Sequence, residues 1–394
     1  MTGLMFLLRR ALRPPWMQLL LVYVLVLAVL LPLIGQGKRH SYYFRASAHL
    51  AGLTEQALAD SLERAEEAES YFREAADGGD GGEDGEKPHM AVVIVTTVRS
   101  QGAEYRYYLQ VAAALHRLLR RCPWCRHYRL MGCNVHPWPA EHWQAEGAAS
   151  RLVPVVRRFA DGGDGQPQPE PESERFEKEK ADYLFCLSRG LALQPRYVLV
   201  MEDDALPSPD LFPVLRDVLE RRLAARDPLY VKLYHPERLQ GFLHPEPARI
   251  MEWAGLGALG GGLLFYLHRR LTGGWASSLS SSLAFCALAA LCMLAAEGYG
   301  RVYLLEARRA SPQLYAMSPA SHCCTPAMAF TARGAARALR YLRARRCRSG
   351  FAKDSALYEA LRDEGDTAYV VEPNLVSHIG LYSTLRGVIE QPSL

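Results

Sequence analysis

The sequence predicts an α/β domain that is interrupted by a transmembrane helical hairpin and preceded by an N-terminal transmembrane anchor. Three patterns predict this class: an apolar run near the N-terminus, a longer apolar zone in the second half, and β-branched runs that alternate with amphipathic helical segments. Because 49% of the 394 residues are apolar and 22% are charged, the chain can form a hydrophobic core. This composition excludes fibrous and wholly disordered proteins.

The first apolar run, residues 16–34, carries no charge and is rich in Leu and Val. A helix of this length spans a hydrocarbon core of roughly 30 Å. The alternative is a signal peptide, but the run is long for one and no clear cleavage site follows it. We therefore expect an uncleaved transmembrane helix, with residues 1–15 as a cytosolic tail.

The second apolar zone has two uncharged stretches, residues 253–267 and 271–296, which flank the basic residues Arg269 and Arg270. It predicts a transmembrane hairpin over residues 253–296, in which glycines and the serines of 277–282 face a partner helix. A buried soluble hairpin is the alternative. The positive-inside rule places Arg269, Arg270 and the N-terminus in the cytosol, so residues 35–252 and 297–394 share the lumenal side.

The lumenal part has a stem and one interrupted domain. Residues 35–89 contain a stem helix over 53–73 and an acidic, Gly-rich loop over 75–89, and a second low-complexity loop covers 160–174. Residues 90–252 and 297–394 are predicted to form the two parts of one domain. The predicted strands are 91–98, 128–135, 197–201, 229–234 and 368–372, and the predicted helices are 105–121, 176–193, 209–226, 332–346 and 353–364. This alternation favours a mainly parallel sheet.

The strongest local motif is an acidic triplet, Glu202, Asp203 and Asp204, directly after the buried strand YVLVM. Ligands of open α/β sheets bind at the carboxyl ends of strands. Three adjacent carboxylates repel one another unless a cation neutralises them, and oxygen ligands favour Mn²⁺ or Mg²⁺. The alternative is a solvated acidic turn. We expect Asp204 to be the leading metal ligand, with Glu202 assisting.

The nine cysteines fit an oxidising lumen better than a disulfide miniprotein. Two lie in the predicted hairpin and seven in the lumenal part, so at least one lumenal cysteine is left over. Cys122 and Cys125 have the spacing of a redox motif, but a disulfide is the expected use. Cys133 and Cys186 are candidates for a second bridge, whereas Cys323 and Cys324 either form a vicinal bridge or pair with separate partners.

The charge balance is nearly even, with 46 basic and 42 acidic residues and a net charge of +4. This balance argues against a nucleic-acid partner that is bound by a strong overall field.

Several segments together carry a family resemblance. They are FEKEKADY (176–183), VLVMEDDA (198–205), LYHPERLQ (233–240), ASHCCTPAM (320–328) and VVEPNLVSHIGL (370–381). The acidic triplet behind an N-terminal anchor resembles Golgi glycosyltransferases of the GT-A fold. The full set of segments resembles the GPI-glycan N-acetylgalactosaminyltransferases among the post-GPI-attachment factors.

This resemblance implies a GT-A-like domain in a multi-pass Golgi membrane protein with a lumenal catalytic domain. It implies transfer of GalNAc from UDP-GalNAc, with inversion and metal assistance, to the first mannose of the GPI core glycan. The partners would then be UDP-GalNAc, GPI-anchored proteins or GPI glycolipid, and the lipid bilayer.

Further site residues are expected on this basis. His378 resembles the C-terminal histidine that completes metal or diphosphate binding in related transferases. Donor binding is assigned to the acidic triplet, in which Asp203 would orient a sugar hydroxyl or ribose. It is also assigned to Thr96, Thr97, Arg99, Thr325 and Lys353, of which Lys353 would counter a phosphate.

An inverting transfer needs one general base near the acceptor hydroxyl. Asp354 is the first candidate, although an Asp in a first helical turn also serves as a cap, and Glu237 is the rival.

Two other functions compete with the enzyme. A non-catalytic Golgi scaffold or cargo receptor with the same fold is the alternative hypothesis, and the presence of the triplet, His378 and Lys353–Asp354 argues against it. A transporter is disfavoured because the predicted spans carry no charge apart from their edges.

Overall fold

The computed structural model describes residues 15–75, 86–160, 174–243, 246–272, 281–383 and 388–389. Most of the expected cytosolic tail, residues 76–85 and 161–173 of the two low-complexity loops, and Ser277, Ser278 and Ser280 lie outside these ranges. The chain divides into two compact units. One consists of residues up to 53 together with 237–307, and the other of residues 54–236 together with 308–394.

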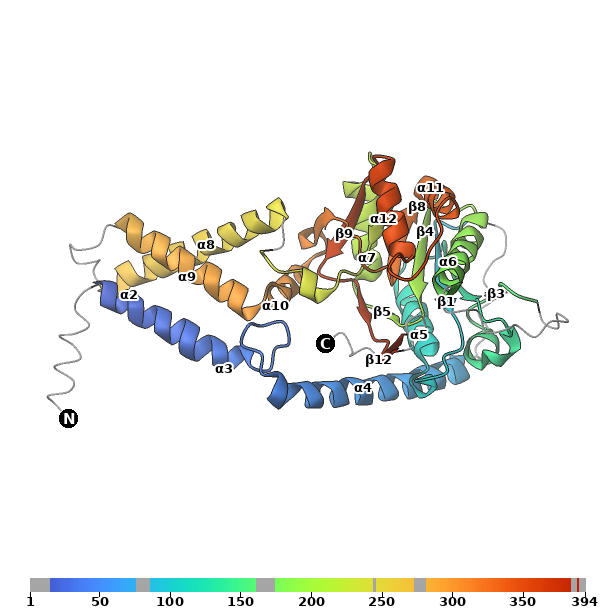
Figure 1. The fold of residues 1–394 in the computed structure, drawn as a ribbon, viewed down its shortest axis with the longest axis horizontal. Coiled ribbons are helices and arrows are strands. Elements are labelled where there is room, and N and C mark those ends of the chain that lie inside the picture. The colour runs from blue at the N-terminus through green and yellow to red at the C-terminus, as the bar shows by residue number, and fades with distance from the viewer. Residues whose placement is uncertain are drawn as a thin grey trace. The chain divides into compact units, whose positions relative to one another are not determined.

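The second unit is built on an eight-stranded sheet with the order β3-β2-β1-β4-β8-β6-β9-β7 (Figure 1). In chain order its strands are β1 Met90–Thr96, β2 Tyr128–Asn134, β3 Val155–Arg157, β4 Tyr197–Glu202, β6 Tyr230–Lys232, β7 Ala316–Pro319, β8 Ala327–Thr331 and β9 Ala368–Glu372. Strands β3, β2, β1 and β4 are mutually parallel, as are β6 and β9.

Segments from both sides of the predicted hairpin share this sheet. Strand β8 lies between β4 and β6 and is antiparallel to both, and β7 pairs antiparallel with β9. One hydrophobic sheet therefore contains residues from 90–236 and from 308–394, as a single interrupted domain requires.

Two helical layers cover the sheet (Figure 1). Helices α5 (Tyr107–Arg121) and α7 (Leu211–Arg216), with the π-turn η6 (Asp217–Arg222), pack in one buried cluster with Ile94 and Leu199. Helices α6 (Arg175–Ala192), α11 (Ala332–Arg343) and α12 (Lys353–Asp363) pack in the other cluster with Val93 and Val200. Successive residues of β1 and β4 thus point to opposite buried faces, which explains their continuous apolar sequences.

Helix α4 (Ala46–Ala75) corresponds to the predicted stem helix. Its C-terminal half belongs to the α/β unit, where Ala68 and Phe72 join the first cluster. The remaining strands are short pairs: β5 (Ala205–Pro207) with β10 (Val376–His378), and β11 (Tyr382–Ser383) with β12 (Val388–Ile389).

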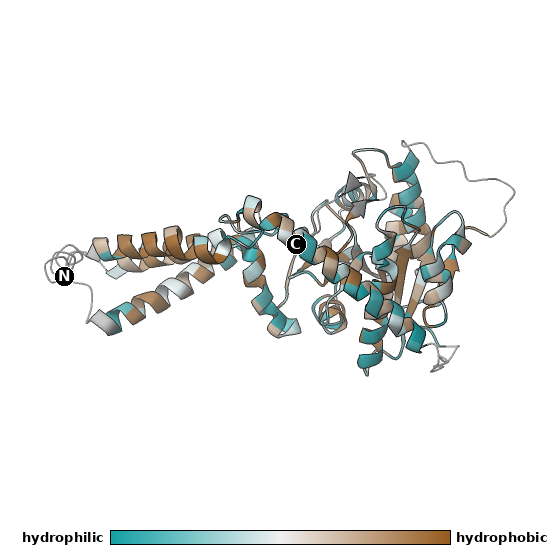
Figure 2. Cartoon of the chain, turned by 90° about the horizontal axis from the view of Figure 1, so that it is seen from below, coloured by the Kyte–Doolittle hydropathy of each residue, from teal (hydrophilic) through white to brown (hydrophobic). Residues whose placement is uncertain are grey.

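The helical unit contains α2 (Pro15–Val24), η1 (Leu25–Leu30), α3 (Leu31–Gly35), α8 (Pro247–Thr272), α9 (Ser281–Tyr299) and α10 (Arg301–Leu305). Among the described residues, three stretches are long and apolar enough to cross a membrane: Trp16–Gly35, Pro247–Arg270 and Ser281–Tyr299. Figure 2 shows the predominance of hydrophobic residues along these helices.

Glycines set the packing of α8 against α9. A Cβ added at Gly261 would lie 2.5 Å from the backbone nitrogen of Ala289, whereas Gly255 has nothing within 4 Å. Gly257 and Gly260 likewise face Met293 and Cys292. The glycines of this helix therefore divide into those that make room for the neighbouring helix and those that do not.

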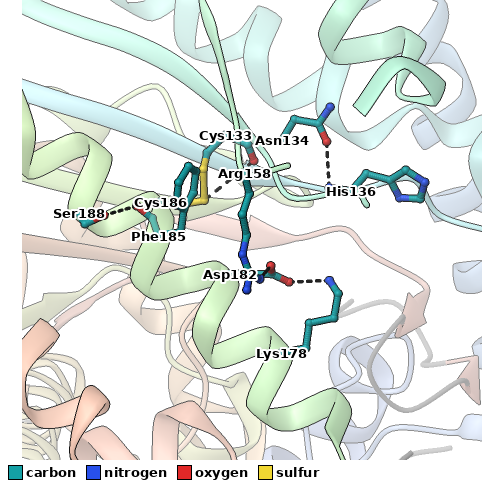
Figure 3. The surroundings of a disulfide bond; sticks show 9 residues. All are labelled: Cys133, Asn134, His136, Arg158, Lys178, Asp182, Phe185, Cys186 and Ser188. Atoms are coloured by element: carbon teal, nitrogen blue, oxygen red, sulfur yellow. Dashed lines mark hydrogen bonds and ion pairs between the residues drawn. A yellow bond between two sulfur atoms is a disulfide. The ribbon is translucent and has the colours of Figure 1, made fainter. Parts of the chain in front are cut away.

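Three disulfides link cysteines that the sequence singled out: Cys122–Cys125, Cys133–Cys186 and the vicinal pair Cys323–Cys324. Cys347 is a buried free thiol, as expected for the leftover cysteine. Figure 3 shows how Cys133–Cys186 joins β2 to α6, beside Asp182, which accepts a hydrogen bond from Lys178 at 2.9 Å.

The structure differs from the predicted elements in several places. Strands β3, β7 and β8 were not predicted, and α8 begins and ends several residues beyond the predicted span of 253–267. The longer α8 includes Arg269 and Arg270, so these residues lie in its last turn and not in a connection between helices.

Candidate active site

The candidate site lies at the carboxyl ends of β1 and β4. The chain runs from β1 outward to β2 and β3 on one side, whereas β4 lies on the other side of β1. Such a switch point leaves a crevice between the two strand ends, where ligands of α/β sheets bind. Thr96 ends β1 and Glu202 ends β4, so the predicted donor-binding segment and the acidic triplet meet there.

Asp203 is buried and is held by Thr96, the last residue of β1, and by Arg99, three residues beyond it. Its Oδ2 accepts a hydrogen bond from the hydroxyl of Thr96 at 2.8 Å, and its Oδ1 accepts a short ionic hydrogen bond from Arg99. Arg99 also donates to Oδ2 of Asp204 at 2.8 Å and lies 5.0 Å from the ring centre of Tyr107. Arg99 therefore bridges two carboxylates of the triplet, and Thr96 fixes the rotamer of one of them.

Asp204 is positioned by the short β5–β10 pair. This pair aligns His378 with Ala205, and the Asp204 carbonyl accepts a hydrogen bond from the Ile379 amide at 2.9 Å. Nε2 of His378 consequently lies 3.6 Å from Oδ2 of Asp204. Gly380 packs against the same carboxylate, because an added Cβ would lie 2.0 Å from Oδ2.

The two buried aspartates have opposite pKa shifts. Burial raises the pKa of Asp203, and the neighbouring Asp204 adds to that rise against the lowering effect of Arg99. Burial would also raise the pKa of Asp204, but Arg99 and then His378 outweigh it, so the pKa of Asp204 is lowered. Asp204 is therefore the carboxylate of the pair that the site holds most firmly in its charged form.

Glu202 is paired with Lys353 at the start of α12. Nζ of Lys353 donates to Oε1 of Glu202 at 3.0 Å and also to Oε1 of Glu179. Burial would lower the pKa of Lys353, but Glu179 and Glu202 raise it. The prediction had Lys353 facing a phosphate, whereas here its ammonium bridges two carboxylates.

Among the residues that the structure describes, one group of side chains has the arrangement of a metal site. Ligand atoms of Glu202, Asp204 and His378 all lie within 4.8 Å of one another. Oδ1 of Asp204 is buried and has no hydrogen-bond partner within the described ranges, so it offers a free lone pair. Two carboxylates and one imidazole suit Mn²⁺ or Mg²⁺ chemically, so these residues fit a divalent ion.

The candidate bases lie in different units. Asp354 is the second residue of α12; its Oδ1 accepts from the Ser355 amide at 2.7 Å and its Oδ2 from the Cys324 amide at 3.0 Å. Its carboxylate therefore accepts a hydrogen bond from one amide of the first helical turn and is also tied to the loop before β8, where Thr325 is buried. Glu237 begins the short helix η7 (Glu237–Leu239) and belongs to the helical unit.

A pocket adjoins Asp203 and contains residues that the sequence analysis did not single out. Thr97 and Arg99 line it together with Tyr107, His142 and other residues, which are Val98, Gly102, Ala103, Arg106, Tyr108, Glu141, Trp143 and Gln144. The hydroxyl of Thr97 lies 3.2 Å from Nδ1 of His136. Thr97 and Arg99, which the sequence analysis predicted to bind the donor, thus lie in the wall of this pocket.

His142 is the most informative of the missed residues. Its Nε2 lies 2.7 Å from Oγ1 of Thr96. Because the Thr96 proton is donated to Asp203, the imidazole must donate to Thr96. Burial, followed by the nearby His136, lowers the pKa of His142 to about 4, so the ring is neutral at neutral pH. Thr96 and His142 are far apart in the sequence, so their spacing did not predict this contact. The segment that follows β2 brings His142 to the end of β1.

The α/β sheet of this topology, the carboxylate–imidazole group at its switch point and the three apolar helices fit the class expected from the sequence, a membrane-associated glycosyltransferase. Residues 90–377 match the model of the family described as GPI-N-acetylgalactosamine transferase PGAP4. This match covers most of the chain, and the chain belongs to that family. The family resemblance noted in the sequence is thereby confirmed.

Proposed function

We propose that this protein is a Golgi enzyme that transfers GalNAc from UDP-GalNAc to the first mannose of the GPI core glycan. Membership of the GPI-N-acetylgalactosamine transferase family supports the acceptor class and the sugar. The observation that carries the mechanism is the grouping of Glu202, Asp204 and His378 beside a pocket at the switch point.

Glu202, Asp204 and His378 would hold a divalent cation, Mn²⁺ or Mg²⁺. When bound, this ion would neutralise the negative charge that develops on the departing diphosphate. Arg99 fixes the orientation of Asp204 and brings a second positive charge to the same edge. Thr96, with His142 behind it, keeps Asp203 directed toward the donor pocket.

The transfer proceeds with inversion at the anomeric carbon. The hydroxyl oxygen of mannose forms a bond to C1 of GalNAc, while the bond from C1 to the UDP oxygen breaks and its electron pair leaves with UDP. Asp354 accepts the hydroxyl proton. Its place in the chain supports this role, since the preceding residue, Lys353, is bonded to Glu202 of the triplet.

The three apolar helices would cross the Golgi membrane, with the N-terminus in the cytosol and the α/β unit in the lumen. Three disulfides in the α/β unit support an oxidising compartment. A membrane anchor also confines the enzyme and a glycolipid acceptor to one surface, which raises their effective concentration.

The test uses the full-length protein in detergent or nanodiscs with a mannose-containing GPI glycolipid. It compares UDP-GalNAc, UDP-GlcNAc, UDP-galactose and UDP-glucose, each with Mn²⁺ and with EDTA. We expect transfer only from UDP-GalNAc, and only when Mn²⁺ is present. Inertness toward every donor would favour a scaffold, and undiminished transfer in EDTA would refute the metal role.

A further inference from the structure

Lys232 is a buried cation that the proposed mechanism does not use. It ends β6, and its side chain is almost fully removed from solvent. Its Nζ donates to the carbonyl oxygens of Ser321 at 2.8 Å and of Cys323 at 2.7 Å. Burying an ammonium group is costly unless its hydrogen-bonding capacity is used, so its position calls for an explanation.

The Cys323 carbonyl and the Cys324 amide belong to one peptide group, and that group connects Lys232 to Asp354. Lys232 binds the oxygen of this peptide, and the nitrogen donates to Oδ2 of Asp354 at 3.0 Å. A cation at the carbonyl and an anion at the amide polarise the peptide in the same sense, which strengthens both hydrogen bonds. The peptide therefore acts as a bridge between a buried charge and the proposed base.

The vicinal disulfide encloses that same peptide group. Cys323 and Cys324 close a small ring around it, and Cys324 has the left-handed backbone angle φ of 68°. Two residues later, the Pro326 carbonyl accepts a hydrogen bond from the Glu202 amide at 2.7 Å. The loop is thus attached on one side to the acidic triplet and on the other to Asp354.

We propose that Lys232 and the Cys323–Cys324 ring are positioning elements that hold the Asp354 carboxylate in place to accept the proton of the acceptor hydroxyl. With one oxygen held by Cys324 and the other by Ser355, the carboxylate cannot rotate freely. This inference rests on the proposed function. The positioning role can fail while the transferase function stands, because the activity could exist with Asp354 oriented in another way.

The first test is Lys232→Met in the full-length protein. We expect kcat for GalNAc transfer to fall about ten- to hundredfold, whereas KM for UDP-GalNAc stays within about twofold, because the donor site is intact. Lys180→Met is the matched control. Lys180 is also buried and donates to a backbone carbonyl, that of Arg345, but its carboxylate partner among the described residues is Glu177 and not Asp354. Retained UDP binding by Lys232→Met shows that the variant is folded.

The second test removes the ring through Cys323→Ser/Cys324→Ser, with Cys122→Ser/Cys125→Ser as the control bridge. We expect the first pair alone to lower kcat at unchanged donor KM. A double-mutant cycle then combines Lys232→Met with Asp354→Asn, and Lys232→Met should add nothing to the loss that Asp354→Asn already causes, since both act through one carboxylate.

Wild-type-like kcat in Lys232→Met and in the ring variant would overturn the inference while leaving the proposed function standing. Additive losses in the cycle would overturn it too. Absence of transfer by the wild-type protein would instead refute the proposed function. If Lys232→Met fails to bind UDP, the ring variant and its control decide the question.

Discussion

The edge of the sheet brings carboxylates close together, and the helical hairpin brings two backbones close together, but different features make each approach possible. At the sheet edge, side chains carry the specificity: Arg99, Lys353 and His378 hold three carboxylates that would otherwise repel one another. In the hairpin the absence of a side chain matters, because Gly261 lets α8 approach the backbone of α9.

The difference is the one expected for a hairpin that crosses a membrane, as the length and apolar composition of α8 and α9 suggest. Helices in lipid gain nothing from burying apolar side chains against each other, so close backbone contact stabilises them. Within the α/β unit, burial raises the energetic cost of each charge and makes every pairing matter. Gly380 combines the two strategies, since it is a glycine that makes room for a carboxylate.

Among the glycine substitutions that test this comparison, Gly380→Ala has the largest expected effect. The added Cβ would lie 2.0 Å from Oδ2 of Asp204, so the carboxylate must move. We expect kcat/KM for GalNAc transfer to fall about a hundredfold or more, as displacements of about 1 Å in active sites do. Gly147→Ala is the control, because nothing lies within 4 Å of its Cβ position. Equal activity of the two variants would show that the position of Asp204 is unimportant.

The next effect concerns stability. Gly261→Leu should destabilise the detergent-solubilised protein by about 2 kcal/mol through a clash with the Ala289 backbone, measured by thermal unfolding. Gly255→Leu, on the same helix but with open space around it, should leave the melting temperature nearly unchanged. If both variants melted alike, the close approach of α8 and α9 would not be a source of stability.

The smallest effect is a pH dependence. Burial lowers the pKa of Lys232 to about 8, against an opposing contribution from Asp354. Above pH 8 the unfolded chain therefore binds more protons than the folded one, and the unfolding free energy rises with pH. Between pH 8 and 9 the rise is about 1 kcal/mol for this group. The wild-type protein should show this increment relative to Lys232→Met, and parallel pH profiles would contradict it.

Local sequence pattern was sufficient for the strands with continuous apolar runs and for the acidic triplet. A strand such as YVLVM followed by EDD marks both a buried element and its carboxyl end, so the location of Glu202 to Asp204 could be predicted. Strand β8 could not, because its sequence AMAFT lacks alternation and its partners β4 and β6 lie far away in the chain.

The sequence did not indicate side-chain contacts between residues that are far apart in the chain. Nothing near His142 in the sequence indicates that its ring reaches Thr96. In the sequence, Lys232 is an ordinary lysine within a predicted strand, and its contacts with the carbonyls of Ser321 and Cys323 are visible only in the structure. Lys353 was predicted as a donor-site residue, but its pairing with Glu179 depends on the packing of α12 against α6.

The central claim is that Asp204 and its neighbours hold a divalent ion for sugar transfer. The most direct measurement is Mn²⁺ binding to the full-length protein in the presence of UDP, by isothermal titration, for wild type, Asp204→Ala and the exposed-site control Asp363→Ala. We expect binding by wild type and by the control, with loss of both binding and GalNAc transfer in Asp204→Ala. Unchanged Mn²⁺ affinity and full transfer in Asp204→Ala would contradict it.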